Sequence, residues 1–234
     1  SQTISHLRFG PDPIKAPYLI ESANFIACHD FNFVQTTQML DRAKQGATFL
    51  LNSPFDADSI WDQLPNHMQK DLIEKEIQFY VIDGVKVARE AGMGRRINTV
   101  MQTCFFALSG VMPKDQAISK IKQYAEKTYA KKGPEIVQKN FAAIDQSLSR
   151  LQKVEIPATV TASADNSENK FAKAPDFVQQ VTSEMVAGRG DWIPVSLLPV
   201  DGTYPTGTTQ WEKRNIAQDI PIWEFDLCIQ CGNC

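Results

Sequence analysis

Apolar runs and amphipathic stretches alternate through the first 110 residues of the chain. Three near-continuous apolar runs of strand length, typical of strands buried on both faces, cover residues 24–29, 47–53 and 77–84. Residues 33–44 have the spacing of a helix that Gly46 ends, and residues 56–76 predict a second helix that Pro65 interrupts. The strand–helix–strand order predicts an α/β fold, a Rossmann-like, mostly parallel sheet with flanking helices.

The pattern changes after Pro113, which begins a predicted helix that ends at residues 131–134. A second helix follows, with one apolar stripe formed by Ile136, Val137, Phe141, Ile144, Leu148 and Leu151. Residues 157–175 are polar and without period, which predicts a linker or extended arm. One short helix ending near Gly188 and a stretch rich in Pro, Gly and Thr complete this small, irregular region.

Composition narrows the class of protein. Apolar residues make up 43% of the chain, enough for a hydrophobic core, and a formal net charge of −3 indicates neither nucleic acid nor an acidic membrane as partner. The apolar runs are too short to span a bilayer, and we find no signal peptide. Cys28 and Cys104 stand alone in apolar surroundings, as expected for reduced core thiols of a cytoplasmic protein.

The last seven residues hold three cysteines, Cys228, Cys231 and Cys234, in the spacing C-x2-C-x2-C. Two-residue gaps let a turning backbone direct successive sulfurs to one centre, as in the bacterial ferredoxin run that binds four-iron clusters. Zinc is the alternative, but zinc sites usually add a second cysteine pair or two histidines, and this sequence offers neither at a suitable spacing. The run therefore favours an iron–sulfur cluster. Because a fourth thiolate is missing and the chain begins without Met, we expect a segment of a longer polypeptide.

Four stretches of the sequence resemble the central part of the pyruvate:ferredoxin (flavodoxin) oxidoreductases. They are residues 5–14 (SHLRFGPDPI), 46–55 (GATFLLNSPF), 79–113 (FYVIDGVKVAREAGMGRRINTVMQTCFFALSGVMP) and 228–234 (CIQCGNC). Residues 79–113 are the most specific of these, because the cysteine run is shared with any ferredoxin.

The resemblance implies an enzyme that oxidatively decarboxylates pyruvate to acetyl-CoA and CO2. It implies thiamine diphosphate and Mg2+ in domains outside this segment, coenzyme A as acyl acceptor, and [4Fe-4S] clusters that pass electrons to ferredoxin or flavodoxin. A homodimer is also implied, and the segment alone is expected to be inactive. The domains would be a coenzyme A-covering Rossmann-like domain at 1–160, incomplete at its N-terminus, a connecting arm at 161–204, and the start of a two-cluster ferredoxin domain at 205–234.

The resemblance also bears on residues 92–98 (GMGRRIN), which precede a helical stretch. Two glycines allow a tight turn, the free N–H groups of a helix start attract anions, and the planar guanidinium of Arg96 suits phosphate. From the residues alone, a turn with solvated arginines is favoured. The resemblance instead implies a coenzyme A contact at Asn98.

Asn140 lies between Ile136 and Ile144, at the edge of the apolar stripe of its predicted helix. From the residues alone, an amide that faces water is favoured. The resemblance implies a second coenzyme A contact there.

We assign no catalytic residue within the segment. His6, His29 and His67 are isolated in the sequence and are interpreted as structural or solvated. Two alternatives to an enzyme segment remain open at this point. One is a non-catalytic electron-transfer module that fuses an α/β domain to a ferredoxin, and the other is a zinc-binding interaction protein.

Overall fold

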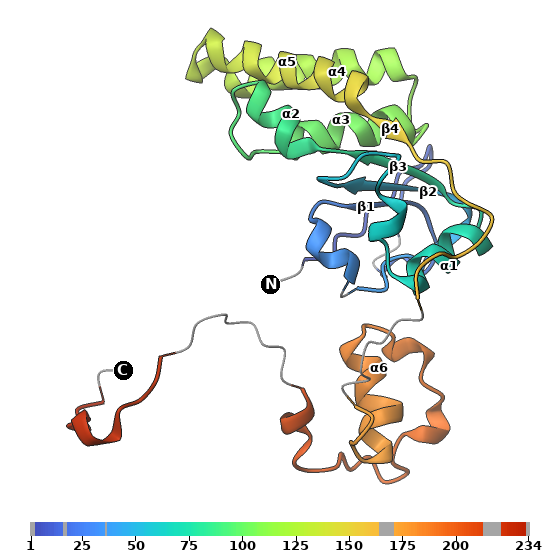
Figure 1. Cartoon of the computed structure of the whole chain (residues 1–234), viewed down its shortest axis with the longest axis vertical. Coiled ribbons are helices and arrows are strands. Elements are labelled where there is room, and N and C mark those ends of the chain that lie inside the picture. The colour runs from blue at the N-terminus through green and yellow to red at the C-terminus, as the bar shows by residue number, and fades with distance from the viewer. Residues whose placement is uncertain (1–2, 16–17, 36, 164–170, 213–220, 233–234) are drawn as a thin grey trace. The chain divides into compact units, whose positions relative to one another are not determined.

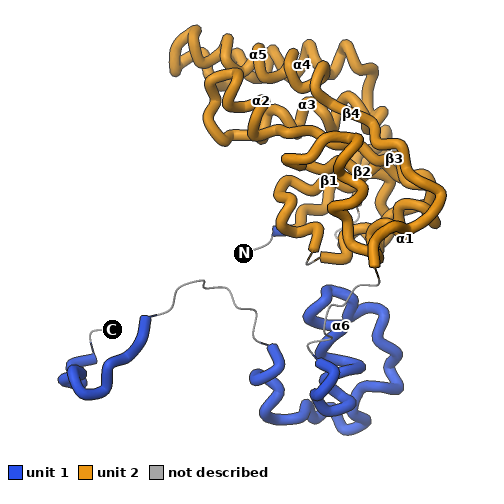
Figure 2. Tube along the Cα trace, in the orientation of Figure 1, with its two compact units in different colours: residues 1–3, 166–234 blue, residues 4–165 orange. Residues whose placement is uncertain are grey.

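The structure is a computed structural model that describes residues 3–15, 18–35, 37–163, 171–212 and 221–232. The chain divides into two compact units, one of residues 4–165 and one of residues 1–3 and 166–234 (Figure 2). The first unit contains the sheet and most of the helices (Figure 1).

The sheet of the first unit has four strands in the order β1-β2-β3-β4. They are β1 (Ala23–Cys28), β2 (Ala43–Asn52), β3 (Gln78–Ile82) and β4 (Gln152–Lys153). Strands β1, β2 and β3 are parallel, and β4 pairs with β3 in the antiparallel sense. The α-helices of this unit are α1 (Asn66–Glu74), α2 (Gly84–Glu90), α3 (Asn98–Leu108), α4 (Lys114–Tyr129) and α5 (Pro134–Arg150). The predicted α/β fold with a mostly parallel sheet is confirmed.

The second part of strand β2, from Ala47 to Asn52, is buried on both of its faces. Phe49 and Leu51 join one apolar cluster with residues of β3 and α1, and the Phe49 ring stacks on Phe79 with centroids 5.2 Å apart. Leu50 points to the opposite face and packs in a second cluster, with Val100 of α3 among its members. Helix α1 accordingly lies on one side of the sheet and α2 to α5 on the other (Figure 1). Each such buried Leu or Phe side chain contributes about 1.5–3 kcal/mol relative to an exposed one.

The predicted helix at residues 33–44 is wrong. The structure has a short 3-10 helix at Phe31–Gln35, and β2 already begins at Ala43, so Gly46 lies inside a strand. The carbonyl of Leu40 accepts a hydrogen bond at 2.7 Å from Nζ of Lys75, the C-cap residue that follows α1. A tertiary contact therefore satisfies a backbone group that the predicted helix would have bonded internally.

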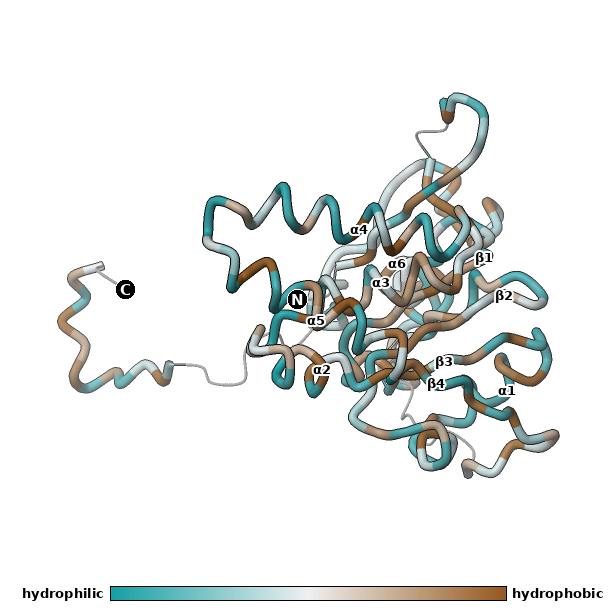
Figure 3. The backbone as a smooth tube through the Cα atoms, turned by 90° about the horizontal axis from the view of Figure 1, so that it is seen from above, coloured by the Kyte–Doolittle hydropathy of each residue, from teal (hydrophilic) through white to brown (hydrophobic). Residues whose placement is uncertain are grey.

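The buried face of α5 is rotated from the predicted apolar stripe. Its buried residues are Val137, Asn140, Ala143, Ile144 and Ser147, whereas Phe141 and Leu148 are half-buried. The small side chains of Ala143 and Ser147 on this face allow α5 to pack closely on α3. Hydrophobic periodicity does not take side-chain size into account, so it does not predict this face. In Figure 3, helix α4 is drawn mainly in hydrophilic colours with apolar positions between them, as expected for a helix with one exposed face.

The second unit has few regular elements within residues 171–212 and 221–232. A π-helical stretch, Val178–Thr182, continues into α6 (Ser183–Val186), close to the predicted short helix, and 3-10 turns follow. Tyr204 holds this region together, because its ring packs edge-to-face on Phe177 and its hydroxyl lies 3.2 Å from Thr182 Oγ1. Across the described parts of both units, the helices are too short or too polar to cross a membrane.

Asn52, the last residue of β2, joins three segments at the carboxyl end of the parallel strands. Its Nδ2 donates to the carbonyl of His29 after β1 at 2.9 Å, and its Oδ1 accepts from the N–H of Gly84, the first residue of α2, at 2.9 Å. A Cβ on Gly84 would lie only 3.0 Å from Asn52 Oδ1, so a larger residue at this position would displace the Asn52 amide by a few tenths of an ångström. The amide of Asn52, 8% exposed, fixes the start of α2 against the sheet.

Replacement of Asn52 by Ala is expected to lower the free energy of unfolding of the first unit by about 1–3 kcal/mol, because the buried N–H of Gly84 and the partly buried carbonyl of His29 lose their partner. Urea unfolding followed by circular dichroism measures this change. The control is Asn24→Ala, at an exposed position of β1, which should change stability little. Equal effects of the two substitutions would contradict the assigned role of Asn52.

Candidate functional site

The loop before α3 brings a helix start and polar groups to one place. Gly92 and Gly94 have φ angles of +73° and +67°, so both glycines adopt the left-handed conformation that the tight turn needs. Helix α3 then begins at Asn98, as the sequence predicts, and its N-cap residue Ile97 makes no side-chain capping bond. The first N–H groups of α3 have no partner within the helix, which leaves donors for an anion at this end.

Two of the predicted site residues lie on this loop and helix start. Asn98 is exposed and occupies the first turn of α3. Arg96 is also exposed, and its Nε donates to the carbonyl of Met93 at 3.2 Å, so the guanidinium is held close to its own loop. Both side chains are accessible to a ligand.

The third predicted residue, Asn140, is 2% exposed and does not face water. The expectation drawn from the residues alone, of an amide in solvent, is therefore wrong. Its Oδ1 accepts from Thr99 Oγ1 at 3.1 Å, and its Nδ2 donates to the carbonyl of Ile136 at 2.8 Å. Because Thr99 directly follows Asn98, the structure brings Asn140 of α5 next to the start of α3.

A groove of about 420 Å3 between α3 and α4 begins at the same helix start. Its lining comprises Thr99, Gln102 and Phe106 of α3, Met112 of the connecting turn, and Ala117, Lys120, Ile121, Tyr124, Ala125, Thr128 and Tyr129 of α4. The volume falls within the range of small-molecule sites, and the lining combines apolar, aromatic and a few polar groups. Thr99 connects this groove to the Asn140 contact.

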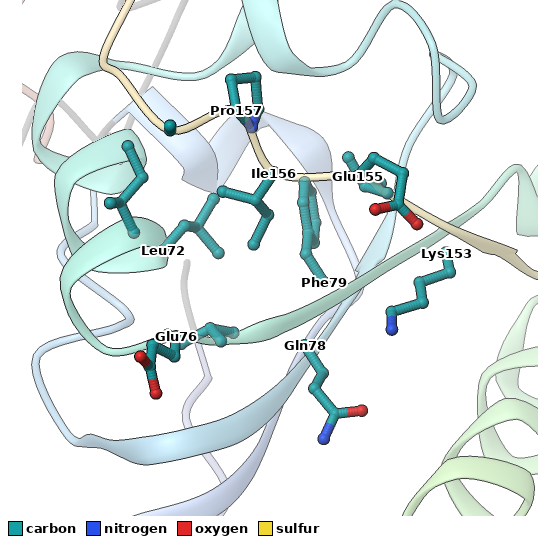
Figure 4. Close-up of a pocket in the computed structure, with 12 residues that line it drawn as sticks. Leu72, Glu76, Gln78, Phe79, Lys153, Glu155, Ile156 and Pro157 are labelled. Carbon is teal, nitrogen blue, oxygen red and sulfur yellow. The ribbon is translucent and has the colours of Figure 1, made fainter.

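A second hollow lies at the β4 edge of the sheet and contains a different set of residues. It measures about 370 Å3, between the end of α1, the start of β3 and residues 153–158. Figure 4 shows the apolar side chains of Leu72, Phe79 and Ile156, with Glu76 and Glu155 at the rim. Asn98, Arg96 and Asn140, all within the described residues, are not part of its lining.

The cysteine run lies in the second unit, where Cys228 and Cys231 are described and Cys234 lies outside the described residues. Gln230 N–H donates to Cys228 Sγ at 3.4 Å, and Gln230 and Gly232 have φ angles of +52° and +74°. Alternating left-handed residues turn backbone N–H groups toward a common concavity, an arrangement found at many iron–sulfur sites. Hydrogen bonds from Trp223 and from Gln230 N–H lower the pKa of the Cys228 thiol, which favours the thiolate that a metal needs.

The described part of the loop therefore suits an anionic iron–sulfur cluster. Two described thiols do not complete a site, and among the described residues no group of three His, Cys, Asp or Glu side chains could hold a metal ion. The third cysteine of the predicted run, Cys234, lies outside the described residues.

Comparison with known proteins identifies the family. The family model "Pyruvate ferredoxin/flavodoxin oxidoreductase" matches residues 1–149. The chain belongs to this family. A second family model, "EKR", a domain of unknown function, matches residues 164–217.

Relatives in this family match the chain along its whole length. The pyruvate-flavodoxin oxidoreductase of Rhodospirillum rubrum is 58% identical over 99% of this chain, and that of Nostoc sp. is 49% identical over 100%. The pyruvate:ferredoxin oxidoreductase of Moorella thermoacetica is 44% identical over 99%. The chain covers 19% of the first of these relatives and 20% of the other two, so it spans about a fifth of their length.

Among solved structures, pyruvate oxidoreductase subunit PORC from Thermotoga maritima is 15% identical, with a TM-score of 0.46. The match covers 58% of this chain and 67% of that chain.

Thr99, which contacts Asn140, and Asn52, which joins β1, β2 and α2, are two residues that the sequence pattern does not identify. In the sequence, Thr99 is indistinguishable from the other residues of an apolar helix. Its contact with Asn140 joins residues 41 positions apart, so no local pattern indicates it. Asn52 has a sequence signal that could have been used, because a polar residue at the end of a continuous apolar strand lies at the carboxyl edge of the sheet.

The two groups of cysteines are expected to differ in reactivity. Burial raises the pKa of Cys28 to about 11 and that of Cys104 to about 12, so little thiolate forms at these sites near neutral pH. In protein freed of iron at pH 8, iodoacetamide should modify Cys228 about a hundredfold faster than Cys104. Peptide mass spectrometry measures the rates.

The unfolded chain is the control for this experiment, because all cysteines should then react at similar rates. Raising the pH toward 11 should speed modification of Cys28 as its thiolate forms. Rapid labelling of Cys104 in the folded protein at pH 8 would contradict its burial within the α3 packing.

Proposed function

We propose that the full-length protein oxidatively decarboxylates pyruvate in the presence of coenzyme A, forming acetyl-CoA and CO2. Two electrons leave singly through [4Fe-4S] clusters to flavodoxin or ferredoxin. The observation that supports this most is the match of 99% of the chain, at 58% identity, to a relative named pyruvate-flavodoxin oxidoreductase. The three relatives named above are oxidoreductases of pyruvate, which favours an enzyme over a module limited to electron transfer.

The coenzyme A contacts of this segment would be Asn98, Arg96 and Asn140. Coenzyme A has phosphate groups joined to a long, mostly neutral arm. The free N–H groups and positive end of α3 suit a phosphate, and Arg96 adds a guanidinium beside them. The groove between α3 and α4 begins one residue from Asn98, so it is placed to take the neutral part of the same ligand.

The remaining assignments follow the resemblance. Residues 1–160 would cover coenzyme A, residues 161–204 would connect, and residues 205–234 would begin a two-cluster ferredoxin domain with Cys228, Cys231 and Cys234 as ligands of one cluster. Thiamine diphosphate with Mg2+, which stabilises the carbanion left by decarboxylation, would bind outside this segment. The enzyme would be a cytoplasmic homodimer, and residues 1–234 alone would not turn over pyruvate.

Asn98→Ala in the full-length enzyme should raise the KM for coenzyme A about tenfold, the effect of losing roughly 1.4 kcal/mol of hydrogen bonding. The KM for pyruvate should stay within about twofold, because pyruvate makes no contact with this residue in our proposal. Steady-state kinetics with each substrate varied in turn measures both values. Asn24→Ala, on the exposed side of β1, is the matched control. Equal rises in both KM values would instead indicate a structural role for Asn98.

Cys231→Ala in the full-length enzyme should remove about one cluster, lowering iron per chain by about four atoms and reducing the visible absorption. Cys104→Ala is the matched control, because this thiol is buried in the core and should lose stability but no iron. Unchanged iron in the Cys231 variant would contradict the ligand assignment. Zinc in place of iron in the purified wild-type enzyme would favour the zinc alternative.

A further inference from the structure

A lysine is held over an aromatic ring at one end of the groove between α3 and α4. The Nζ of Lys132 lies 5.6 Å from the ring centroid of Tyr129, which is a cation–π contact. Tyr129 is half-buried and lines the groove. Lys132 is exposed and belongs to the 3-10 turn Ala130–Lys132 that follows α4. The ring therefore keeps a positive charge beside the groove.

The arrangement of α3 and α4 brings this lysine to the end of the groove where α3 begins. The two helices are joined by the short turn at residues 109–113 and pack against each other, so they run antiparallel (Figure 1). The first turn of α3, with Thr99, therefore lies near the last turn of α4, with Thr128 and Tyr129, and all three residues line the groove. Lys132 thus lies at the same end of the groove as Asn98.

Another lysine makes a similar ring contact without these features. The Nζ of Lys122 lies 5.6 Å from the ring centroid of Phe141, but it also forms an ion pair with Asp145 Oδ1 at 2.7 Å. Neither Lys122 nor Phe141 lines the groove. Lys132, in contrast, forms no ion pair with a described carboxylate. Its charge is available to an anionic ligand.

Coenzyme A has two separate phosphate sites on one ribose, a pyrophosphate at the 5′ oxygen and a phosphate at the 3′ oxygen. If the pyrophosphate binds at the start of α3 and the neutral arm enters the groove, the 3′-phosphate stays at this end of the groove. Lysine binds phosphate as a point charge, and Lys132 is placed at this end. Lys120, which lines the groove directly, lies about 12 Å before Thr128 along α4, where only the neutral arm would pass.

We propose that Lys132 is a specificity-determining residue that binds the ribose 3′-phosphate of coenzyme A and so distinguishes coenzyme A from analogues that lack this phosphate. The inference rests on the coenzyme A site under Proposed function and adds the selectivity of that site. The Tyr129 ring limits the freedom of the lysine before the ligand arrives, which reduces the side-chain entropy lost on binding.

Lys132→Met in the full-length enzyme removes the charge and keeps most of the length of the side chain. Steady-state kinetics at saturating pyruvate measures kcat/KM for coenzyme A and for dephospho-coenzyme A, which lacks only the 3′-phosphate. The variant should lose about tenfold in kcat/KM for coenzyme A, because it loses one hydrogen bond between charged groups. Its kcat/KM for dephospho-coenzyme A should stay within about twofold of the wild-type value, so the preference for coenzyme A falls about tenfold.

Three further variants separate the charge from the packing. Lys132→Arg keeps a cation that can stack on the Tyr129 ring, so it should retain the preference for coenzyme A. Tyr129→Phe keeps the ring and removes only the hydroxyl, so it should retain the preference as well. Lys122→Met is the matched control, because it removes a lysine with a similar ring contact away from the groove. It should change both kcat/KM values by less than about twofold.

The outcomes separate this inference from the proposed function. Equal losses with both substrates in Lys132→Met would overturn the role of Lys132, because its charge would then act on the pyrophosphate or on the fold. A wild-type enzyme without any preference for coenzyme A over dephospho-coenzyme A would overturn it too. So would a preference that is lost in Lys120→Met and kept in Lys132→Met. Failure of the wild-type enzyme to form acetyl-CoA from pyruvate and coenzyme A would instead refute the proposed function.

Discussion

The burial of β2 on both faces is the constraint on which the first unit depends. Phe49, Leu50 and Leu51 are consecutive and fully buried, so each face of the sheet must have its own cover. A parallel neighbour can be reached only by a crossover, and the crossover from β2 to β3 supplies the cover of one face, whereas the segment between β3 and the antiparallel β4 supplies the cover of the other. Helix α1 protects the face of Phe49 and Leu51, and the group of α2 to α5 protects the face of Leu50. The start of α3 is positioned as a consequence of this layering.

The sequence predicts an element of this fold when neighbouring residues determine it, and fails where a contact from a distant element determines it. The run at residues 47–53 and the turn before Asn98 are local signals, and the structure has a strand and a helix start there. The segment at 33–44 has helical spacing, but its described residues include the end of a 3-10 helix and the start of β2, and the Lys75 side chain bonds the carbonyls of Leu40 and Asp41 from a distant element. Periodicity measures only the hydrophobic stripe and cannot detect such a contact.

The same distinction applies to the two candidate sites. The loop that contains Cys228 and Cys231 is built from about ten consecutive residues, so spacing alone indicates its chemistry. The site at α3 requires an asparagine that lies 42 positions beyond Asn98 in the sequence. The burial of this asparagine, Asn140, could not be derived from hydrophobicity. The helical period places a polar residue at the edge of the apolar stripe. The small residues around it, Ala143 and Ser147, are what place it in the centre of the buried face.

The buried amide of Asn140 is limited in what it can offer a ligand. A side-chain amide has two N–H donors and two acceptor lone pairs. One donor is used by the carbonyl of Ile136 and one lone pair by the hydroxyl of Thr99, so a single N–H and a single lone pair remain. Leaving the amide unpaired inside the protein would cost about 1–3 kcal/mol, so both bonds should persist when a ligand binds. Asn140 therefore holds Thr99, and with it the start of α3, and has one N–H and one lone pair left for a ligand, while exposed Asn98 has its whole amide free for direct recognition.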